Sequence, residues 1–313
     1  MPLIPTRGTA RSVAVAGALL LLAACADRPP PAPEFNAGRA WSYLNAQLAF
    51  GPRYAGNRGH ARQLAWMVDE LRFRADTVVQ QKFTARDSAG KALELTNVVA
   101  RFRPELRDRV LLVANWDTRR RADGSPEPLD RKFPVPGANV NASGVAVLME
   151  MAQLFRQQPP SIGVDLLLAD GDDHSREVSL AGTRHFLAQM PGYRPRYAVV
   201  LRGVADADAR FPMDAGSAAQ AGEPARRMWD AARALGYDTV FVAQTAPGAP
   251  GQGLVLAAAG IPTVVVMDRE YGPLNMRWHA SDDLPRYLRR ETLGIVGQTL
   301  AEAIYAETPG PES

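Results

Sequence analysis

Four segments of the chain are continuously apolar and do not alternate with polar residues. They read VLLVA at 110–114, VDLLLA at 164–169, YAVVL at 197–201 and TVVVM at 263–267. Strands of a parallel sheet show this pattern, because helices cover both of its faces. The four segments therefore predict the central strands of a parallel sheet, the third of them extending over 197–204.

Segments with helical spacing of apolar residues lie between these strands. We expect helices at 37–50, 60–73, 141–157, 179–189, 224–235 and 286–307, and a shorter helix at 254–259. Additional strands are expected at 77–83 and 93–102, which could pair antiparallel at one edge, and a short one at 241–243. Strands that alternate with helices predict a single-domain three-layer α/β/α sandwich with a mixed, largely parallel central sheet.

The first 25 residues have the pattern of a targeting segment. Arg7 and Arg11 precede an apolar stretch at 13–22 that is too short to span a bilayer. The segment ends LAAC, which resembles the bacterial lipobox, and Cys25 is the only cysteine of the chain. We expect residues 1–25 to be a lipoprotein signal peptide ending at a lipidated Cys25, with an ordinary cleaved signal as the alternative.

The Pro-rich residues 26–36 predict an extended tether, and residues 37–310 a folded domain. A lipid on Cys25 would place this domain in the cell envelope, attached to a membrane at its periplasmic face or at the surface. The sequence leaves the choice of membrane and the oligomeric state open.

Charge excludes one class of partner. The chain has 36 Lys and Arg against 33 Asp and Glu, a formal net charge of +3, and no basic run interleaved with aromatic residues. Nucleic acid is therefore not expected as a partner. The densest basic cluster is Arg119, Arg120 and Arg121, which we interpret as a solvated loop.

Polar residues follow each central strand. In such sheets, ligands bind beyond the carboxyl ends of the strands. Asn115 and Asp117 follow the first strand, the DGDDH segment at 170–174 follows the second, and Arg202 follows the third. The segments 271–279 and GANVNASG at 137–144 should reach the same edge. Bundled carboxylates repel one another, so they indicate a cation or a catalytic site; a solvated turn with a helix cap is the alternative.

The order of these segments resembles the zinc exopeptidase family that contains bacterial leucyl aminopeptidases and glutaminyl cyclases. The similarity runs from about Gly51 to the C-terminal helix. It rests on GPRYAGNRGH at 51–60, ANWDT at 114–118, GANVNASG at 137–144, ADGDDHS at 169–175, GIPTVVVMD at 260–268 and WHASDD at 278–283.

The resemblance implies one or two zinc ions held by histidine and carboxylate ligands. By position, Asp172 would be the general base or acid, and Asp173 and His279 would bind metal. Trp278, Asn115 and Arg202 would line a substrate pocket for a peptide or an N-terminal peptide-like ligand. Asp117 and Asp170 are expected to have structural roles, and Asp282 and Asp283 to cap or flank the last helix.

Several positions depart from the family pattern. Asn115 stands in place of a histidine ligand, Val140 in place of an aspartate, and Arg202 in place of a further aspartate. Gln252 and Gly253 stand where cyclases have an Asp-His pair. His174 or His185 could supply a replacement ligand.

These losses predict that zinc is weakly bound or absent and that the domain is catalytically inactive or impaired. The alternative is an active metal-dependent aminopeptidase or glutaminyl cyclotransferase with a rebuilt site that uses Asp172, Asp173 and His279. A third possibility is a structural envelope lipoprotein without a ligand.

Overall fold

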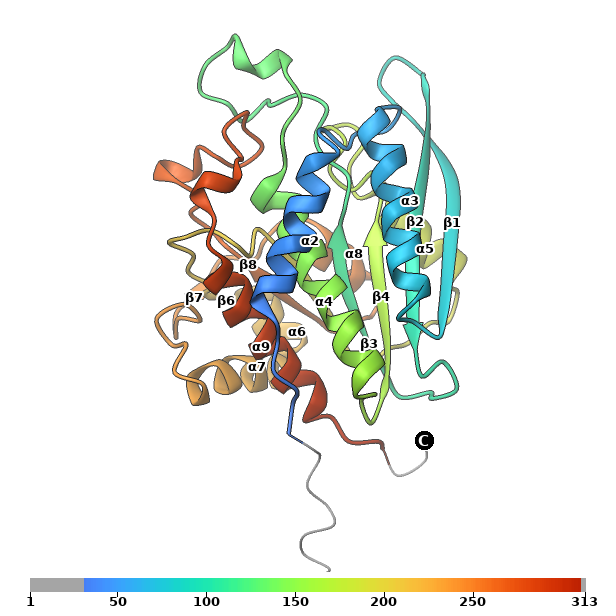
Figure 1. Cartoon of the computed structure of the whole chain (residues 1–313), viewed down its shortest axis with the longest axis vertical. Coiled ribbons are helices and arrows are strands. Elements are labelled where there is room, and N and C mark those ends of the chain that lie inside the picture. The colour runs from blue at the N-terminus through green and yellow to red at the C-terminus, as the bar shows by residue number, and fades with distance from the viewer. Residues whose placement is uncertain (1–30, 311–313) are drawn as a thin grey trace, which may run out of the picture.

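The computed structural model describes residues 31–310, and the fold is shown in Figure 1. The expected signal peptide, Cys25 and the first part of the expected tether lie outside the described residues. Within residues 31–310, no helix is long and apolar enough to cross a membrane.

A six-stranded sheet forms the centre of the domain. Its strands are β1 (Thr77–Arg86), β2 (Ala92–Phe102), β3 (Arg109–Asn115), β4 (Gly163–Ala169), β5 (Ala198–Arg202) and β8 (Thr263–Met267). Their order across the sheet is β1-β2-β4-β3-β5-β8. The β1·β2 and β2·β4 pairs are antiparallel, and the β4·β3, β3·β5 and β5·β8 pairs are parallel. The predicted mixed sheet with an antiparallel edge is confirmed.

Helices cover both faces of this sheet, as Figure 1 shows. One face is covered by α2 (Ala37–Ala49), α3 (Arg58–Arg72), α4 (Gly144–Gln157) and α9 (Arg290–Tyr305), and the other by α5 (Ala181–Gln189) and α8 (Gln252–Ala258). Near β8 lie α6 (Ala215–Gln220), α7 (Gly222–Ala234) and a small sheet of β6 (Met213–Asp214) and β7 (Thr245–Ala246). The three-layer sandwich follows from this arrangement.

The apolar character of β3 reflects burial on both faces. Leu112 belongs to the cluster on the α4 side of the sheet, and Leu111 and Val113 pack with Phe186 of α5 in the cluster on the other side. A strand with only one buried face would alternate with polar residues, so the continuous apolar pattern records the two helical layers.

Two predicted elements differ from the structure. The strand expected at 241–243 is absent from this described segment, and a two-residue strand forms at 245–246 instead. The Phe241 side chain packs against Phe211 and Trp229 in the core, and only two backbone hydrogen bonds join residues 240–242 to Phe211. The last helix begins at Arg290 rather than at 286. Pro285 opens a separate 3-10 turn, after which Leu288 and Arg289 are extended.

The segment before α2 already packs onto the domain. The Phe35 ring is 5% exposed and lies against Gly297 of α9, where a Cβ atom would come within 2.3 Å of the ring. The Phe35 backbone N–H also donates to Gln298 at 2.8 Å. Ala32 packs against the core as well, and Gln158 donates to the Pro31 carbonyl oxygen at 3.2 Å, so part of the expected tether belongs to the packed domain.

Candidate functional site

The carboxyl ends of the parallel strands meet at the edge where the sequence predicted a site. Asp173, in the loop after β4, lies 3.3 Å from the Arg202 guanidinium at the end of β5. The His279 Nε2 atom, in the loop after β8, lies 3.0 Å from the same carboxylate oxygen. The convergence of three segments more than 25 residues apart in sequence is therefore a property of the parallel topology.

Asp173 is the centre of this cluster. Its side chain is 1% exposed, and Arg119 donates to its Oδ1 at 3.0 Å. Asn141 donates its amide N–H to Oδ2 at 3.0 Å. Burial alone would raise the pKa of Asp173, but His279, Arg202 and Arg119 outweigh burial and hold the pKa well below its ordinary value. Asp173 is therefore a buried anion with four donors around it.

Two arginines carry the positive charge of the cluster. Burial lowers the pKa of His279, although Asp173 opposes the shift. Arg119 also pairs with Asp123 at 2.9 Å, and Asp123 pairs in turn with the exposed Arg176. The buried Asp173 carboxylate therefore has two guanidinium partners among the described residues.

Arg119 is the residue that the sequence interpretation missed. We had placed it with Arg120 and Arg121 in a solvated loop, but its side chain is buried and points to Asp173, while the other two are exposed. The signal that could have revealed it is the lost ligand set. A buried carboxylate without a metal needs another cation, and Arg119 lies two residues beyond Asp117.

Asp172 faces away from this cluster. It accepts hydrogen bonds from the Thr183 N–H at 3.0 Å, from the Thr183 hydroxyl, and from the Gln252 amide at 2.8 Å. Burial raises the pKa of its carboxyl, although these bonds oppose the shift. The predicted general base is thus held by α5 and α8.

Asp117 and Asp170 have the structural roles expected for them. Asp117 accepts from the backbone N–H groups of Asp172 and Asp173 at 3.2 and 3.0 Å, which fixes the loop after β4. Asp170 accepts from the Thr96 N–H at 2.6 Å and contacts the His60 Nε2 at 3.0 Å. Both acids orient backbone and ring atoms of the site.

Asp283 corrects a further expectation. It is fully buried and does not cap the last helix. Its carboxylate accepts from the N–H groups of Asn139 and Val140 at 2.7 and 3.2 Å and from the Tyr271 hydroxyl at 3.0 Å. Burial raises the pKa of Asp283 to about 6. The residue therefore joins the loop after β8 to the π-helical turn Ala138–Ser143, which opens α4. Its neighbour Asp282 remains accessible and pairs with Arg286.

The residues present do not fit a zinc ion. Catalytic zinc sites use about three nitrogen, sulfur or carboxylate ligands. Asn115 is buried and donates to the Asp117 carbonyl oxygen at 3.4 Å, and Val140 offers no donor atom. Arg119 and Arg202 occupy the open side of Asp173, and among the described residues no group of three or more His, Cys, Asp and Glu is arranged to hold a metal.

The other histidines do not complete a ligand set. His185 stacks on Phe83 with ring centroids 4.3 Å apart, and His60 stacks on Trp116 at the same distance. His174 is buried, and burial lowers its pKa to about 4. The contacts that Asp173 makes within residues 31–310 include none of these three imidazoles.

Two of the residues expected in a substrate pocket, Trp278 and Arg202, lie together. The Arg202 guanidinium stands 5.1 Å from the Trp278 ring centroid. Asn115 is 2% exposed, so it does not line an accessible surface.

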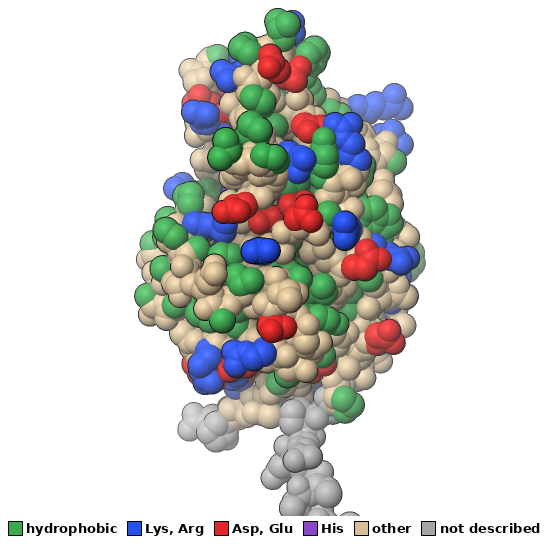
Figure 2. Space-filling model, turned by 90° about the vertical axis from the view of Figure 1, so that its left-hand side faces the viewer, with side chains coloured by type: hydrophobic (Ala, Val, Ile, Leu, Met, Phe, Trp, Pro, Cys, Tyr) green, Lys and Arg blue, Asp and Glu red, His purple; other side chains and the backbone are tan. Residues whose placement is uncertain are grey.

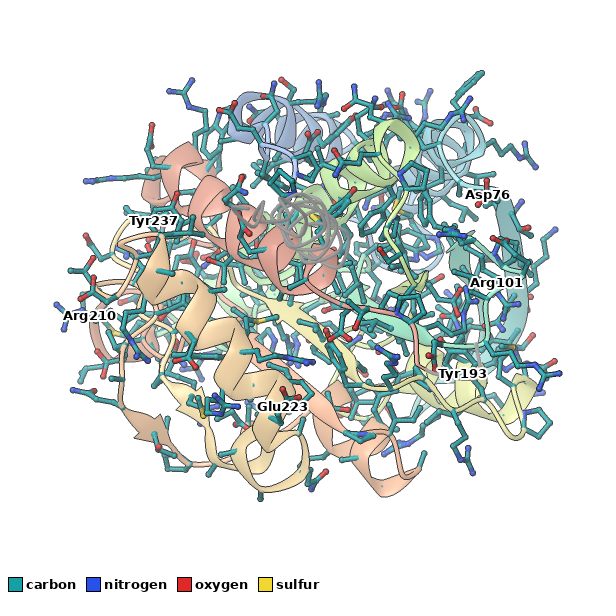
Figure 3. The ribbon with its side chains drawn as sticks, turned by 90° about the horizontal axis from the view of Figure 1, so that it is seen from below. Asp76, Arg101, Tyr193, Arg210, Glu223 and Tyr237 are labelled. Carbon is teal, nitrogen blue, oxygen red and sulfur yellow. The ribbon has the colours of Figure 1, made fainter. Side chains whose placement is uncertain are left out.

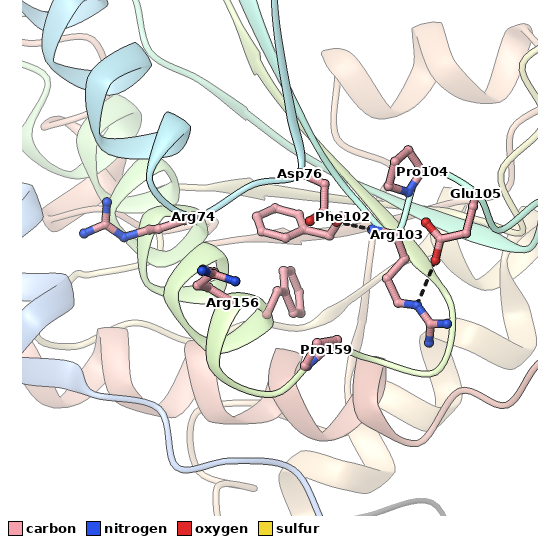
Figure 4. A pocket seen from close by; sticks show the side chains of 9 residues that line it. Arg74, Asp76, Phe102, Arg103, Pro104, Glu105, Arg156 and Pro159 are labelled. Atoms are coloured by element: carbon pink, nitrogen blue, oxygen red, sulfur yellow. Dashed lines mark hydrogen bonds and ion pairs between the residues drawn. The ribbon is translucent and has the colours of Figure 1, made fainter.

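A basic and aromatic cavity of about 350 Å³ lies elsewhere. It is lined by residues at the C-terminal ends of α3 and β2. Figure 4 shows Arg103 paired with Glu105 there, with Arg74 and Arg156 on the other side. The cavity shares no residue with the Asp173 cluster and is distinct from the candidate site.

Known structures share this fold closely. A glutaminyl cyclase from Tannerella forsythia is 29% identical, with a TM-score of 0.83 over 88% of this chain and 100% of that chain. A Zn-dependent exopeptidase from Parabacteroides distasonis is 31% identical, with a TM-score of 0.83 over 88% and 99%. A leucine aminopeptidase precursor from Bacteroides thetaiotaomicron is 28% identical, with the same TM-score and coverage.

Sequence comparison leads to the same group. The uncharacterized protein YfbL of Escherichia coli is 31% identical over 127 residues, which span 39% of this chain and only 38% of that protein. A model of peptidase family M28 matches residues 97–304. These residues include β3, β4, β5 and β8 and every member of the Asp173 cluster, and the chain therefore belongs to peptidase family M28.

Proposed function

We propose that this protein is a catalytically silent M28 domain, in which two guanidinium groups replace the positive charge of the metal. The observation that carries the proposal is the contact of Asp173 with both Arg119 and Arg202, at 3.0 and 3.3 Å. Zinc in a hydrolytic site must keep a position open for water or substrate. In this protein the corresponding space beside Asp173 is filled by arginine side chains.

The hydrogen bonds of Asp172 support the same proposal. A general base has to reach a proton on the attacking water or substrate. Asp172 is held by Thr183 and Gln252 and is 5% exposed. Trp278 lies beside Arg202, and we infer that the domain binds a peptide or a peptide-like group there without cleaving it.

The alternative is an active enzyme with a rebuilt site. Its support is the similarity to a glutaminyl cyclase and to a leucine aminopeptidase precursor. Such an enzyme would use Asp172, Asp173 and His279, and would have to displace the two guanidinium groups before metal could bind.

Metal content separates the two proposals. We expect the purified mature domain to carry well under one zinc per chain by elemental analysis. We also expect hydrolysis of a leucyl anilide, and cyclisation of an N-terminal glutaminyl peptide, to stay at the level of an Asp173→Asn variant. One tightly held zinc per chain, with activity that a chelator removes, would establish the alternative.

The lipid anchor is proposed from LAAC at 22–25 and the Pro-rich segment after it. We expect Cys25→Ser to move the protein from the membrane fraction to the soluble fraction, because a single thiol is the lipid acceptor. Incorporation of a labelled fatty acid should be lost in the same variant. Membrane association that survives the substitution would contradict the anchor.

A further inference from the structure

A second cavity opens beside the loops that follow β5 and β8. Its volume is about 700 Å³, and Asp173, Arg202 and His279 are not among its lining residues. Charged residues predominate in its lining, among them Asp206, Asp208, Arg210, Asp268, Arg269 and Arg277.

Two buried carboxyl groups meet in the wall of this cavity. Asp206 and Asp268 are 3% and 2% exposed, and their side chains are hydrogen-bonded to each other. The Oδ1 atom of Asp268 accepts from the Glu270 N–H at 3.1 Å. The Arg210 N–H is also close to this carboxyl. Apart from the acid proton that the two carboxyl groups share, the buried Oδ2 atom has no well-formed hydrogen bond within the described chain.

Such a pair must hold either a proton or a cation, because two adjacent carboxylates repel each other. Burial, followed by the neighbouring Asp206, raises the pKa of Asp268 to about 7. The pair therefore loses its proton near neutral pH, and a cation can then bind between the two carboxylates. Since no three acidic or histidine side chains of residues 31–310 are arranged for a metal, a cation that brings its own N–H donors fits the pair better.

The arginines of the cavity do not supply this cation. Arg277 stacks on Tyr287, 3.6 Å from the ring centroid, and Arg269 donates to the Pro247 carbonyl oxygen at 2.6 Å. Arg210 is exposed, and Figure 3 places it at the outer edge of the molecule on the side of β6 and β7. On the face of the protein that includes this side, acidic side chains gather midway up, with basic ones next to them (Figure 2).

We propose that this cavity binds a primary ammonium group, which donates its N–H bonds to Asp206 and Asp268. An ammonium group offers three donors and a full charge, and so satisfies both the orphan oxygen and the repulsion between the two acids. The inference does not depend on whether the Asp173 cluster is silent. A lysine side chain, a peptide N-terminus and a free diamine all carry such an ammonium group, and each could be the ligand.

The test is calorimetric titration of the full mature domain with three probes at about pH 8: putrescine, Nα-acetyl-lysine amide and glycylglycine amide. We expect at least one probe to bind. The probe with the highest affinity should identify which kind of ammonium compound the cavity binds. Nα-acetyl-norleucine amide, which lacks the charge, should not bind.

Two variants with the same change in charge locate the site. Asp268→Asn removes a buried carboxylate. It should lower the affinity for the probe by about tenfold or more, because the ammonium loses a desolvated partner. Asp208→Asn removes an exposed acid from the rim of the same cavity. It should lower the affinity for the probe by less than about threefold, as expected for a solvated charge. Equal effects of the two variants, equal binding of the norleucine amide, or no binding by any probe would overturn the proposal. Calcium chloride that competes as well as the amines would also overturn it in favour of an inorganic cation.

The pH profile of stability provides a readout without ligand. In the unfolded chain Asp268 ionises near pH 4, whereas in the folded protein its pKa is about 7. Between these values the folded state holds the extra proton, so stability should fall as pH rises through this window. We expect the melting temperature of Asp268→Asn to gain on that of the wild type from about pH 5 to pH 8. A constant difference would show that the folded protein does not raise the pKa of Asp268, and would contradict a buried acid that holds a proton up to neutral pH.

Discussion

Replacing Asp173 by Asn is expected to lower the free energy of unfolding at pH 7 by about 3 kcal/mol, because it removes the anion that holds two buried guanidinium groups. The side chains of Arg119 and Arg202 are 10% and 14% exposed, so neither can regain full hydration without a shift of the loops. Asparagine keeps the shape of the side chain, but it removes the carboxylate partner of Arg202 and leaves Arg119 paired with Asp123 alone. Urea denaturation of the wild type and the variant measures the difference.

Asp123→Asn is the matched control. Asp123 pairs with Arg119 as well, but its side chain is 29% exposed and its other partner, Arg176, is 73% exposed. An accessible pair of this kind contributes about 1 kcal/mol or less. Losses of equal size in the two variants would mean that burial of the Asp173 cluster does not determine its contribution.

The effect of Asp173 should also depend on pH, in a direction opposite to that of Asp268. The folded protein holds the pKa of Asp173 below its value of about 3.9 in the unfolded chain. The stability that it contributes is therefore complete above about pH 5 and is lost as pH falls through the acid range. The gap between the wild type and Asp173→Asn should narrow over that range.

Much of the fold was predictable, because strands that are buried on both faces of a sheet have continuously apolar sequences. The runs at 110–114 and 164–169 are apolar throughout, and they became adjacent parallel strands. The segment at 241–243 is also apolar, but its burial comes from packing of Phe241 with two aromatic side chains. A short apolar stretch records burial and does not by itself record a hydrogen-bonded ladder.

The position of the site at the sheet edge was predictable from the sequence, but the contacts between its side chains were not. Parallel topology brought Asp173, Arg202 and His279 together, as their positions after successive strands indicated. The roles of Arg119 and Asp283 depend on contacts with residues 54 and 144 positions away. A periodic pattern contains no information on such contacts.

The pairing bears on the proposed silent domain, because a buried carboxylate without a counter-ion is costly. Arg119 and Arg202 place positive charge beside Asp173, and Asn141 supplies a further hydrogen bond. If the domain is silent as proposed, these contacts would stabilise Asp173 in the absence of metal.

Rebuilding the ligand set is expected to create zinc-dependent stability. The triple variant Asn115→His, Val140→Asp, Arg202→Asp restores the residue types of the family at three positions around Asp173 and His279. Without metal it should be less stable than the wild type, because new carboxylates lie beside Asp173 and one of its two guanidinium partners is gone. A zinc concentration about a hundredfold above the dissociation constant should then stabilise it by about 2.7 kcal/mol.

That stabilisation corresponds to a rise in melting temperature of about 5 °C for a domain of this size. The double variant that keeps Arg202 should show a much smaller rise, because the guanidinium remains on the Asp173 oxygen that the metal needs, and the wild type should show none beyond error. Adding His279→Ala to the triple variant removes an imidazole ligand and should abolish most of the rise. Melting temperature against zinc concentration for the four proteins is the measurement. If the triple variant does not respond to zinc, or if the wild type responds equally, then these side chains do not surround a common point and Arg202 does not stand in the place of the metal.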